Sequence, residues 1–139
     1  WAATDPDLEK DITGSYEVSV SDNMDMVMET TRQLREFCNA HQLGAGKSFR
    51  ICLAVEEIAG NIVEHGFTGK KGKHFIDLRL TLEKDGSGCL SLRDNGVKFN
   101  PLEYRNRDTQ YGLAIIRGIS EKIDYHYVAS MNCLNVMIR

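Results

Sequence analysis

The order of patterns along the chain predicts an α+β fold: a two-layer α/β sandwich in which helices cover one face of a mixed, mainly antiparallel sheet. The clearest pattern is the strict alternation of apolar and polar residues from Ile76 to Leu82, as in a half-buried strand. A Gly-rich turn at 85–88 leads into a second strand that ends at Asp94, which makes a hairpin. Two helical patterns precede this hairpin, and a third helix and another hairpin follow it.

The first part of the chain contains a polar lead, a strand and a helix. Residues 1–14 are polar and mixed in charge and are expected to form a flexible lead, so the folded domain is predicted to span 15–139. Alternation around Val18 predicts the first strand. Ser21 or Asp22 is predicted to cap a helix that ends near Gly44. The apolar face of this helix is formed by Met24, Val27, Thr31, Leu34 and Cys38.

The second helix is predicted over about 47–65, with Ser48 as its N-cap. The segment Gly44-Ala45-Gly46-Lys47-Ser48 resembles the end of a phosphate-binding P-loop. That motif requires an earlier glycine where this chain has His41, and it requires a preceding strand where a helix is predicted. A connection between two helices explains the segment better.

The last third of the chain is predicted to form a helix and a closing hairpin. Ile115, Ile116 and Ile119 have helical spacing, and Asp108 or Thr109 is a suitable N-cap. Alternating residues in 123–128 and 133–138 predict the two strands of the hairpin.

Composition favours a single globular domain of 139 residues and argues against several classes of function. The net charge of −3 gives no basic field for nucleic acid. No apolar run approaches the roughly 20 residues of a membrane span. The four cysteines have neither zinc nor redox spacing, so reduced thiols and a cytoplasmic location are expected. The chain begins with Trp1, so a further upstream domain is possible.

The second helix carries a polar row beside its apolar row. Glu57, Asn61 and His65 are spaced by four residues, so an unbroken helix would stack them at the edge of the core. A carboxamide oxygen suits magnesium, and a carboxylate one turn earlier could accept a proton. Taken alone, such a row is more often a solvated helix flank.

Two later segments have residues suited to a nucleotide. Asp94 ends a strand, where its carboxylate could bind an amino group, and Gly96 lets a ring approach the backbone. Gly112 lies in the first turn of the third helix, where free N–H groups can hold phosphate. Each segment alone also fits an ordinary turn or helix start.

In this order, the three segments resemble the ATP-binding fold of gyrase, a heat-shock chaperone, histidine kinases and mismatch-repair ATPases (the Bergerat, or histidine-kinase-like ATPase, type). The matching motifs are Glu57-x-x-x-Asn61, Asp94-x-Gly96 and Gly112-Leu113. The compact spacing resembles the bacterial anti-sigma-factor serine/threonine kinases, and the resemblance extends from about residue 16 to residue 139.

The resemblance implies roles for individual residues. ATP and Mg²⁺ are the expected cofactors; Asn61 would hold Mg²⁺, Asp94 would bind the adenine amino group, and Glu57 would be the catalytic base. The other expected nucleotide contacts are His65, Gly96, Lys98, Phe99, Arg105, Gly112, Leu113 and Ala114, with Arg107 as a second lid arginine. The chain departs from the family at Lys98 and Ala114, where glycines are usual.

The resemblance also implies partners. An anti-sigma antagonist would supply the acceptor serine, a sigma factor would be held by the same protein, and a homodimer is possible; neither nucleic acid nor membrane is expected. Met24, Met26 and Met28 would suit an interface. Two alternatives remain open: a non-catalytic ATP-binding regulatory module associated with a phosphatase, and an interaction domain that has lost nucleotide binding.

Overall fold

The computed structural model describes residues 12–103 and 110–139, with the backbone alone at 110–113. In chain order, the elements are β1 (Ile12–Ser21), α2 (Met24–Ala40), α3 (Ala45–Asn61), the π-helix η1 (Ile62–Gly66), β2 (Phe75–Glu83), β3 (Gly88–Asp94), α4 (Gln110–Ile119), β4 (Ser120–Val128) and β5 (Met131–Ile138). The predicted order of strand, two helices, hairpin, helix and hairpin is confirmed.

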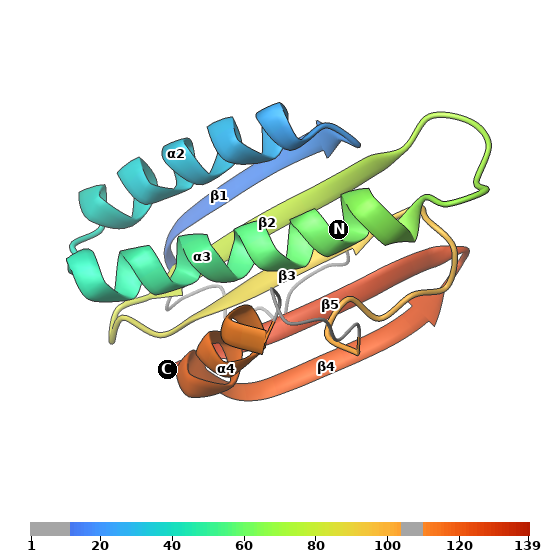
Figure 1. Ribbon diagram of the computed structural model, residues 1–139. Coiled ribbons are helices and arrows are strands. Elements are labelled where there is room, and N and C mark those ends of the chain that lie inside the picture. Colours follow the sequence, from blue (N-terminus) through green and yellow to red (C-terminus); the bar gives the residue numbers. More distant parts are fainter. Residues whose placement is uncertain (1–11, 104–109) are drawn as a thin grey trace.

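The five strands form one sheet in the order β1-β2-β3-β5-β4. Every pairing between the described strands is antiparallel, so the parallel component of the predicted mixed sheet does not occur among them. The helices α2, α3 and α4 lie on one face of this sheet, as predicted (Figure 1).

The core lies between the sheet and its helices. In β2, buried and partly exposed residues alternate along the whole strand, as the sequence pattern predicted. Their helical partners include Leu34 on α2 and Ile51 and Ile58 on α3, each no more than 1% exposed. Burying such a side chain is worth about 1.5–3 kcal/mol, so this interface fixes the position of α3 on the sheet.

The helix starts differ from the predicted ones. Asn23 caps α2 and accepts a hydrogen bond from the backbone of Asp25. The predicted cap Asp22 is used elsewhere, because its carboxylate bonds to His74. At α3 the predicted cap Ser48 is buried within the helix, and Gly44 is the N-cap because its φ of +84° lets the chain turn sharply after α2.

Two further predictions are corrected at the surface of α2 and in the lead. Met24 is 41% exposed instead of lying in the core, and Met26 and Met28 are also exposed. β1 begins at Ile12, inside the segment assigned to the lead, because residues 12–14 pair with β2. Residues 1–11 lie outside the described ones.

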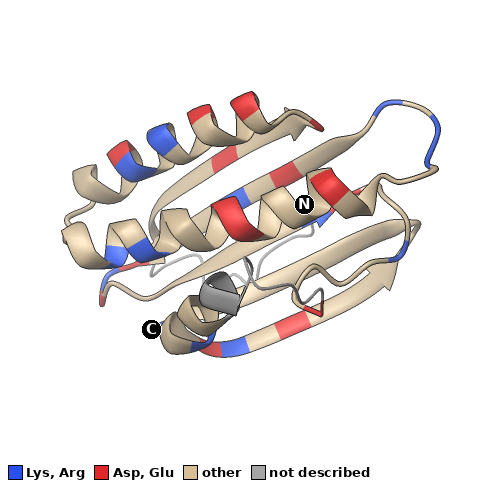
Figure 2. Ribbon diagram, in the orientation of Figure 1, with Lys and Arg blue, Asp and Glu red and all other residues tan. Residues whose placement is uncertain are grey.

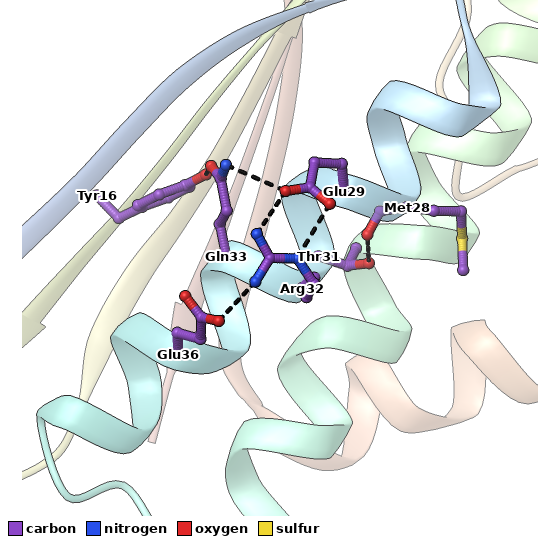
Figure 3. Close-up of polar contacts among 7 residues, drawn as sticks. All are labelled: Tyr16, Met28, Glu29, Thr31, Arg32, Gln33 and Glu36. Carbon is purple, nitrogen blue, oxygen red and sulfur yellow. Dashed lines mark hydrogen bonds and ion pairs between the residues drawn. The ribbon is translucent and has the colours of Figure 1, made fainter.

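The outer side of α2 carries a paired polar cluster (Figure 3). Arg32 bonds to Glu29 at 2.5 Å and to Glu36 at 2.6 Å, so its charge is compensated locally. Gln33 accepts a hydrogen bond from Tyr16 on β1 at 3.0 Å. The Tyr16–Gln33 contact joins α2 to the edge strand of the sheet.

Candidate functional site

The candidate site lies where the end of α3 meets the turn that follows β3. Three contacts join them: the Asn61 amide donates to the Pro101 carbonyl at 3.3 Å, the Val97 N–H donates to the Gly66 carbonyl at 2.8 Å, and the rings of His65 and Phe99 lie 6.4 Å apart. The first two predicted motifs are therefore brought together, although they are far apart in sequence.

The polar row on the second helix is interrupted at Asn61. The α-helix ends there, and residues 62–66 form a π-helix, so the predicted continuous helix over 47–65 is wrong at both ends. A π turn has more residues per turn than an α-helix, so His65 does not continue the row of Glu57 and Asn61. Asn61 is 5% exposed, and the His65 side chain is 28% exposed.

Asn61 presents its amide group from a buried position. Its nitrogen donates to the Pro101 carbonyl, so the side-chain oxygen is the atom through which it would contact a cation. No group of three or more His, Cys, Asp or Glu side chains among the described residues could hold a metal ion. Asn61 therefore suits Mg²⁺ bound by one protein oxygen together with ligand phosphates, which is a common arrangement.

Asp94 is the most deeply buried carboxylate of the candidate site, at 2% exposure. Its Oδ1 atom accepts hydrogen bonds from the Gly96 N–H at 2.9 Å and from the Asn132 amide at 3.0 Å. Burial raises the pKa of Asp94, and these two hydrogen bonds oppose that rise. Because both donors act on one oxygen, the other oxygen suits a ligand amino group.

Gly96 permits a close approach, but to the protein's own backbone. A side chain at this position would overlap the Gly66 carbonyl oxygen, which accepts the hydrogen bond from Val97. The sequence predicted that Gly96 makes room for a ligand ring; the structure shows that it makes room for the end of the π-helix.

Asn132 on β5 is a site residue that sequence reasoning missed. It is 2% exposed and donates to Asp94 at 3.0 Å and to the Val97 carbonyl at 2.8 Å. Its oxygen accepts from the Phe99 N–H at 2.9 Å and from the Tyr125 hydroxyl at 2.5 Å. One buried side chain thus connects the candidate adenine-binding carboxylate to the turn beside it.

Lys98 and Phe99 lie at the rim of a cavity of about 480 Å³ next to this turn. Asn100, Glu103 and Tyr125 complete its lining. Lys98 is exposed to solvent, and Phe99 is partly buried. Lys98 is therefore placed at a cavity beside the candidate site, where it can reach a ligand.

The third predicted motif is described in part. Gly112 lies in the first turn of α4, as predicted, and Ala114 is exposed. The backbone of Leu113 is helical. Arg105, Arg107 and the predicted caps Asp108 and Thr109 lie outside the described residues.

The segment that resembles a P-loop has no phosphate-binding geometry. A helix precedes it, and Lys47 donates to the Gly86 carbonyl at the β2–β3 turn.

The four cysteines are free thiols, and burial raises the pKa of the Cys38 thiol to about 11, which makes it unreactive. No helix in the described part of the chain is long and apolar enough to cross a membrane.

Comparison with known structures supports the fold. The RsbU and RsbW domains of Rv1364c from Mycobacterium tuberculosis match with a TM-score of 0.68 and 21% identity over 91% of this chain, which corresponds to only 32% of that chain. The SiaB-SiaC complex from Pseudomonas aeruginosa matches with a TM-score of 0.67 and 15% identity over 94% of this chain and 92% of that chain.

A histidine kinase domain from Erythrobacter litoralis matches with a TM-score of 0.53 and 16% identity over 66% of this chain and 43% of that chain. A comparison with curated protein sequences finds no match. The sequence model for the histidine kinase-like ATPase domain matches residues 20–138, which includes every site residue described above. The chain therefore belongs to the histidine kinase-like ATPase domain family.

Proposed function

We propose that this chain binds ATP with Mg²⁺ and transfers the γ-phosphate to a serine or threonine of a partner protein in the cytoplasm, as an anti-sigma-factor kinase does. The observation that carries the proposal is the buried Asp94 carboxylate, which is held by Gly96 and Asn132 next to the helix end that presents Asn61. Family membership and the likeness to structures of RsbW and SiaB support it.

Each residue of the site is proposed to contact a different part of the nucleotide. Asp94 accepts a hydrogen bond from the adenine amino group through the oxygen that its protein donors leave available. Asn61 supplies an oxygen ligand to Mg²⁺, which neutralises charge on the phosphates. The first turn of α4 at Gly112 offers backbone N–H groups to phosphate oxygens.

Glu57 is proposed as the base that accepts the proton from the acceptor hydroxyl. It lies one helical turn before Asn61 on α3 and is partly exposed, so it can face both the phosphates and a partner. Phosphoryl transfer depends mainly on positioning and charge neutralisation, so one base together with Mg²⁺ and backbone donors is sufficient. The natural acceptor is proposed to be an anti-sigma antagonist, with regulation of a sigma factor as the outcome.

A non-catalytic ATP-binding regulatory module is the second candidate. The specific observation in its favour is the exposed Lys98, which occupies a position where the family usually has glycine. Both candidates bind ATP, and only the kinase transfers phosphate.

Calorimetric titration with ATP and Mg²⁺ tests the nucleotide site. The wild type should bind in the micromolar range, and Asn61→Ala should bind at least tenfold more weakly. The matched control is Asn39→Ala, which alters an exposed asparagine on α2 and should bind like the wild type. Absence of binding at millimolar ATP would overturn both candidate functions.

Transfer is measured with γ-labelled ATP and dephosphorylated casein as a generic acceptor, or as slow hydrolysis to water. Glu57→Gln should retain ATP affinity and lose transfer. Tight ATP binding with no transfer or hydrolysis by the wild type would reject the kinase and select the regulatory module.

A further inference from the structure

One end of the molecule carries a group of basic side chains beside the candidate nucleotide site. Lys70, Lys71 and Lys73 lie on the loop between η1 and β2, and Lys98 lies on the turn after β3 (Figure 2). Lys71, Lys73 and Lys98 are exposed. This concentration is notable in a chain whose net charge is −3.

The two segments that carry these lysines are held together by the Asn95 side chain. Its oxygen accepts from the Phe75 N–H at 3.0 Å, and its nitrogen donates to the Lys73 carbonyl at 2.7 Å. The Val97 N–H also bonds to the Gly66 carbonyl at 2.8 Å. The lysine loop and the turn with Lys98 therefore form one connected surface.

His74 fixes the same loop from its other side. Its ring stacks on Phe67 with centroids 4.5 Å apart and an interplanar angle of 2°. One ring nitrogen lies 2.8 Å from the Lys70 carbonyl, and the other lies 2.9 Å from the Asp22 carboxylate. These contacts anchor the loop at Lys70 and His74, and such anchoring reduces the entropy lost on binding.

The exposed lysines form no ion pairs with carboxylates of the described residues. No ion pair within the described residues involves Lys71, Lys73 or Lys98, whereas Arg32 and Arg93 are paired with carboxylates. Of the acidic residues nearest in sequence, Asp77 pairs with Arg93 and Asp94 is buried. Glu103 lines the same cavity as Lys98 but forms no ion pair with it. A surface of uncompensated positive charge attracts an anionic partner and speeds its association.

Exposed apolar residues lie at the same end of the sheet. Val97 is 37% exposed, and at the β4–β5 turn Tyr127 is 37% and Val128 is 55% exposed. Strand register places Tyr127 in the same row as Asn132 and Asp94, so the turn lies beside the candidate site. A mixture of apolar and charged side chains is typical of protein interfaces, and the net negative charge of the chain disfavours nucleic acid.

We infer that this end of the molecule is a docking surface for an acidic region of the partner protein that accepts the phosphate. The surface is formed by Lys70, Lys71, Lys73, Val97, Lys98, Tyr127 and Val128. We call these residues the end surface. This inference rests on the proposed kinase function, because it assigns the surface to the phosphate acceptor. Docking here brings the acceptor to the edge of the site that contains Asp94 and Asn61.

Binding of fluorescein-labelled poly-L-glutamate, followed by anisotropy, tests the surface. The test variant is Lys71→Glu/Lys73→Glu, and the control is Lys84→Glu/Lys122→Glu, which replaces exposed lysines elsewhere and changes the net charge equally. The test variant should weaken binding at least tenfold and reduce its salt dependence, because it removes exposed charge–charge attractions that salt screens. The control should change binding less than twofold.

Other outcomes overturn the inference. Equal weakening in both variants would mean that net charge, not the end surface, attracts the probe. No binding by the wild type would remove the basis for an acidic partner. Tighter binding to phosphatidylserine vesicles or to a single-stranded oligonucleotide, lost in Lys71→Glu/Lys73→Glu, would assign the surface to a membrane or to nucleic acid.

ATP titration of the same proteins separates this inference from the proposed function. Neither pair of lysines contacts the nucleotide site, so both variants should bind ATP like the wild type and unfold at the same urea concentration. Normal ATP binding with no selective loss of polyglutamate would reject the end surface alone. If the wild type does not bind ATP, the proposed function is rejected instead.

Discussion

Asn132 offers the sharpest test of how the candidate site is built. Its side chain makes four hydrogen bonds from a position that is 2% exposed, and two of them reach Asp94 and the Val97 carbonyl. Asn132→Ala leaves the buried carboxylate with the Gly96 N–H as its remaining donor among the described residues. The other three hydrogen bonds of Asn132 are only partly buried, so water can replace the bonds to Val97, Phe99 and Tyr125.

The expected loss in the free energy of unfolding depends on which groups remain buried without a hydrogen-bond partner. Leaving a buried polar group unsatisfied costs about 1–3 kcal/mol, and more when it is charged. Asp94 therefore accounts for most of the loss, and the total should be about 3 kcal/mol. The pKa of Asp94 should rise further, because a hydrogen bond that lowers it is removed.

Urea unfolding and ATP titration measure the two consequences. The matched control is Asn135→Ala on the same strand, which loses one partly exposed hydrogen bond to Ser91 and should cost less than about 1 kcal/mol. Asn132→Ala should also bind ATP about ten- to a hundredfold more weakly, since a tenfold change corresponds to about 1.4 kcal/mol. Equal stability losses in Asn132→Ala and Asn135→Ala would refute this account of Asn132.

Three further predictions concern the surroundings of the site. Gly96→Ala should destabilise the protein by about 2 kcal/mol in urea, because the new methyl group displaces the Gly66 carbonyl; no loss would mean that the turn relaxes freely. The hydrogen bond to Asp22 raises the pKa of His74 above 6.5, so its stabilising effect is present at acidic pH and is lost as the pH rises through the raised value. Urea midpoints in Asp22→Asn should lose that pH dependence, and an unchanged profile would assign it elsewhere. Ser130→Gly should stabilise the protein by about 0.5 kcal/mol, because φ at Ser130 is +60°, a conformation that glycine adopts without strain. A lower midpoint of thermal unfolding in this variant would contradict the prediction.

The elements that could be predicted from the sequence are those specified by local patterns. Alternation over β2 reflects burial on one face of the sheet, and the turn before β3 contains glycine at a positive φ of 85°. Asp94 could be identified because a carboxylate at a strand end, followed by glycine two residues later, matches a known motif. These signals lie within a few residues of the features that they predict.

The features that were missed depend on contacts between distant segments. Asn132 occupies an inward position of β5, but its partner Asp94 is 38 residues away, so nothing near Asn132 in the sequence signals its role. The π-helix after Asn61 has no local pattern that distinguishes it from an ordinary helix. The cap of α2 was assigned one or two residues too early because the side chain of Asp22 is used by His74, 52 residues away.

The support around Asp94 also bears on why a carboxylate is present there. Burial raises its pKa, so ionisation of this group opposes folding at neutral pH, and the hydrogen bonds from Gly96 and Asn132 offset only part of that cost. An apolar residue at the end of β3 would avoid both the burial penalty and the need for Asn132. Proteins tolerate such local conflicts mainly at functional sites. The arrangement therefore favours a ligand that needs a fixed hydrogen-bond acceptor at this position, as the adenine amino group of ATP does.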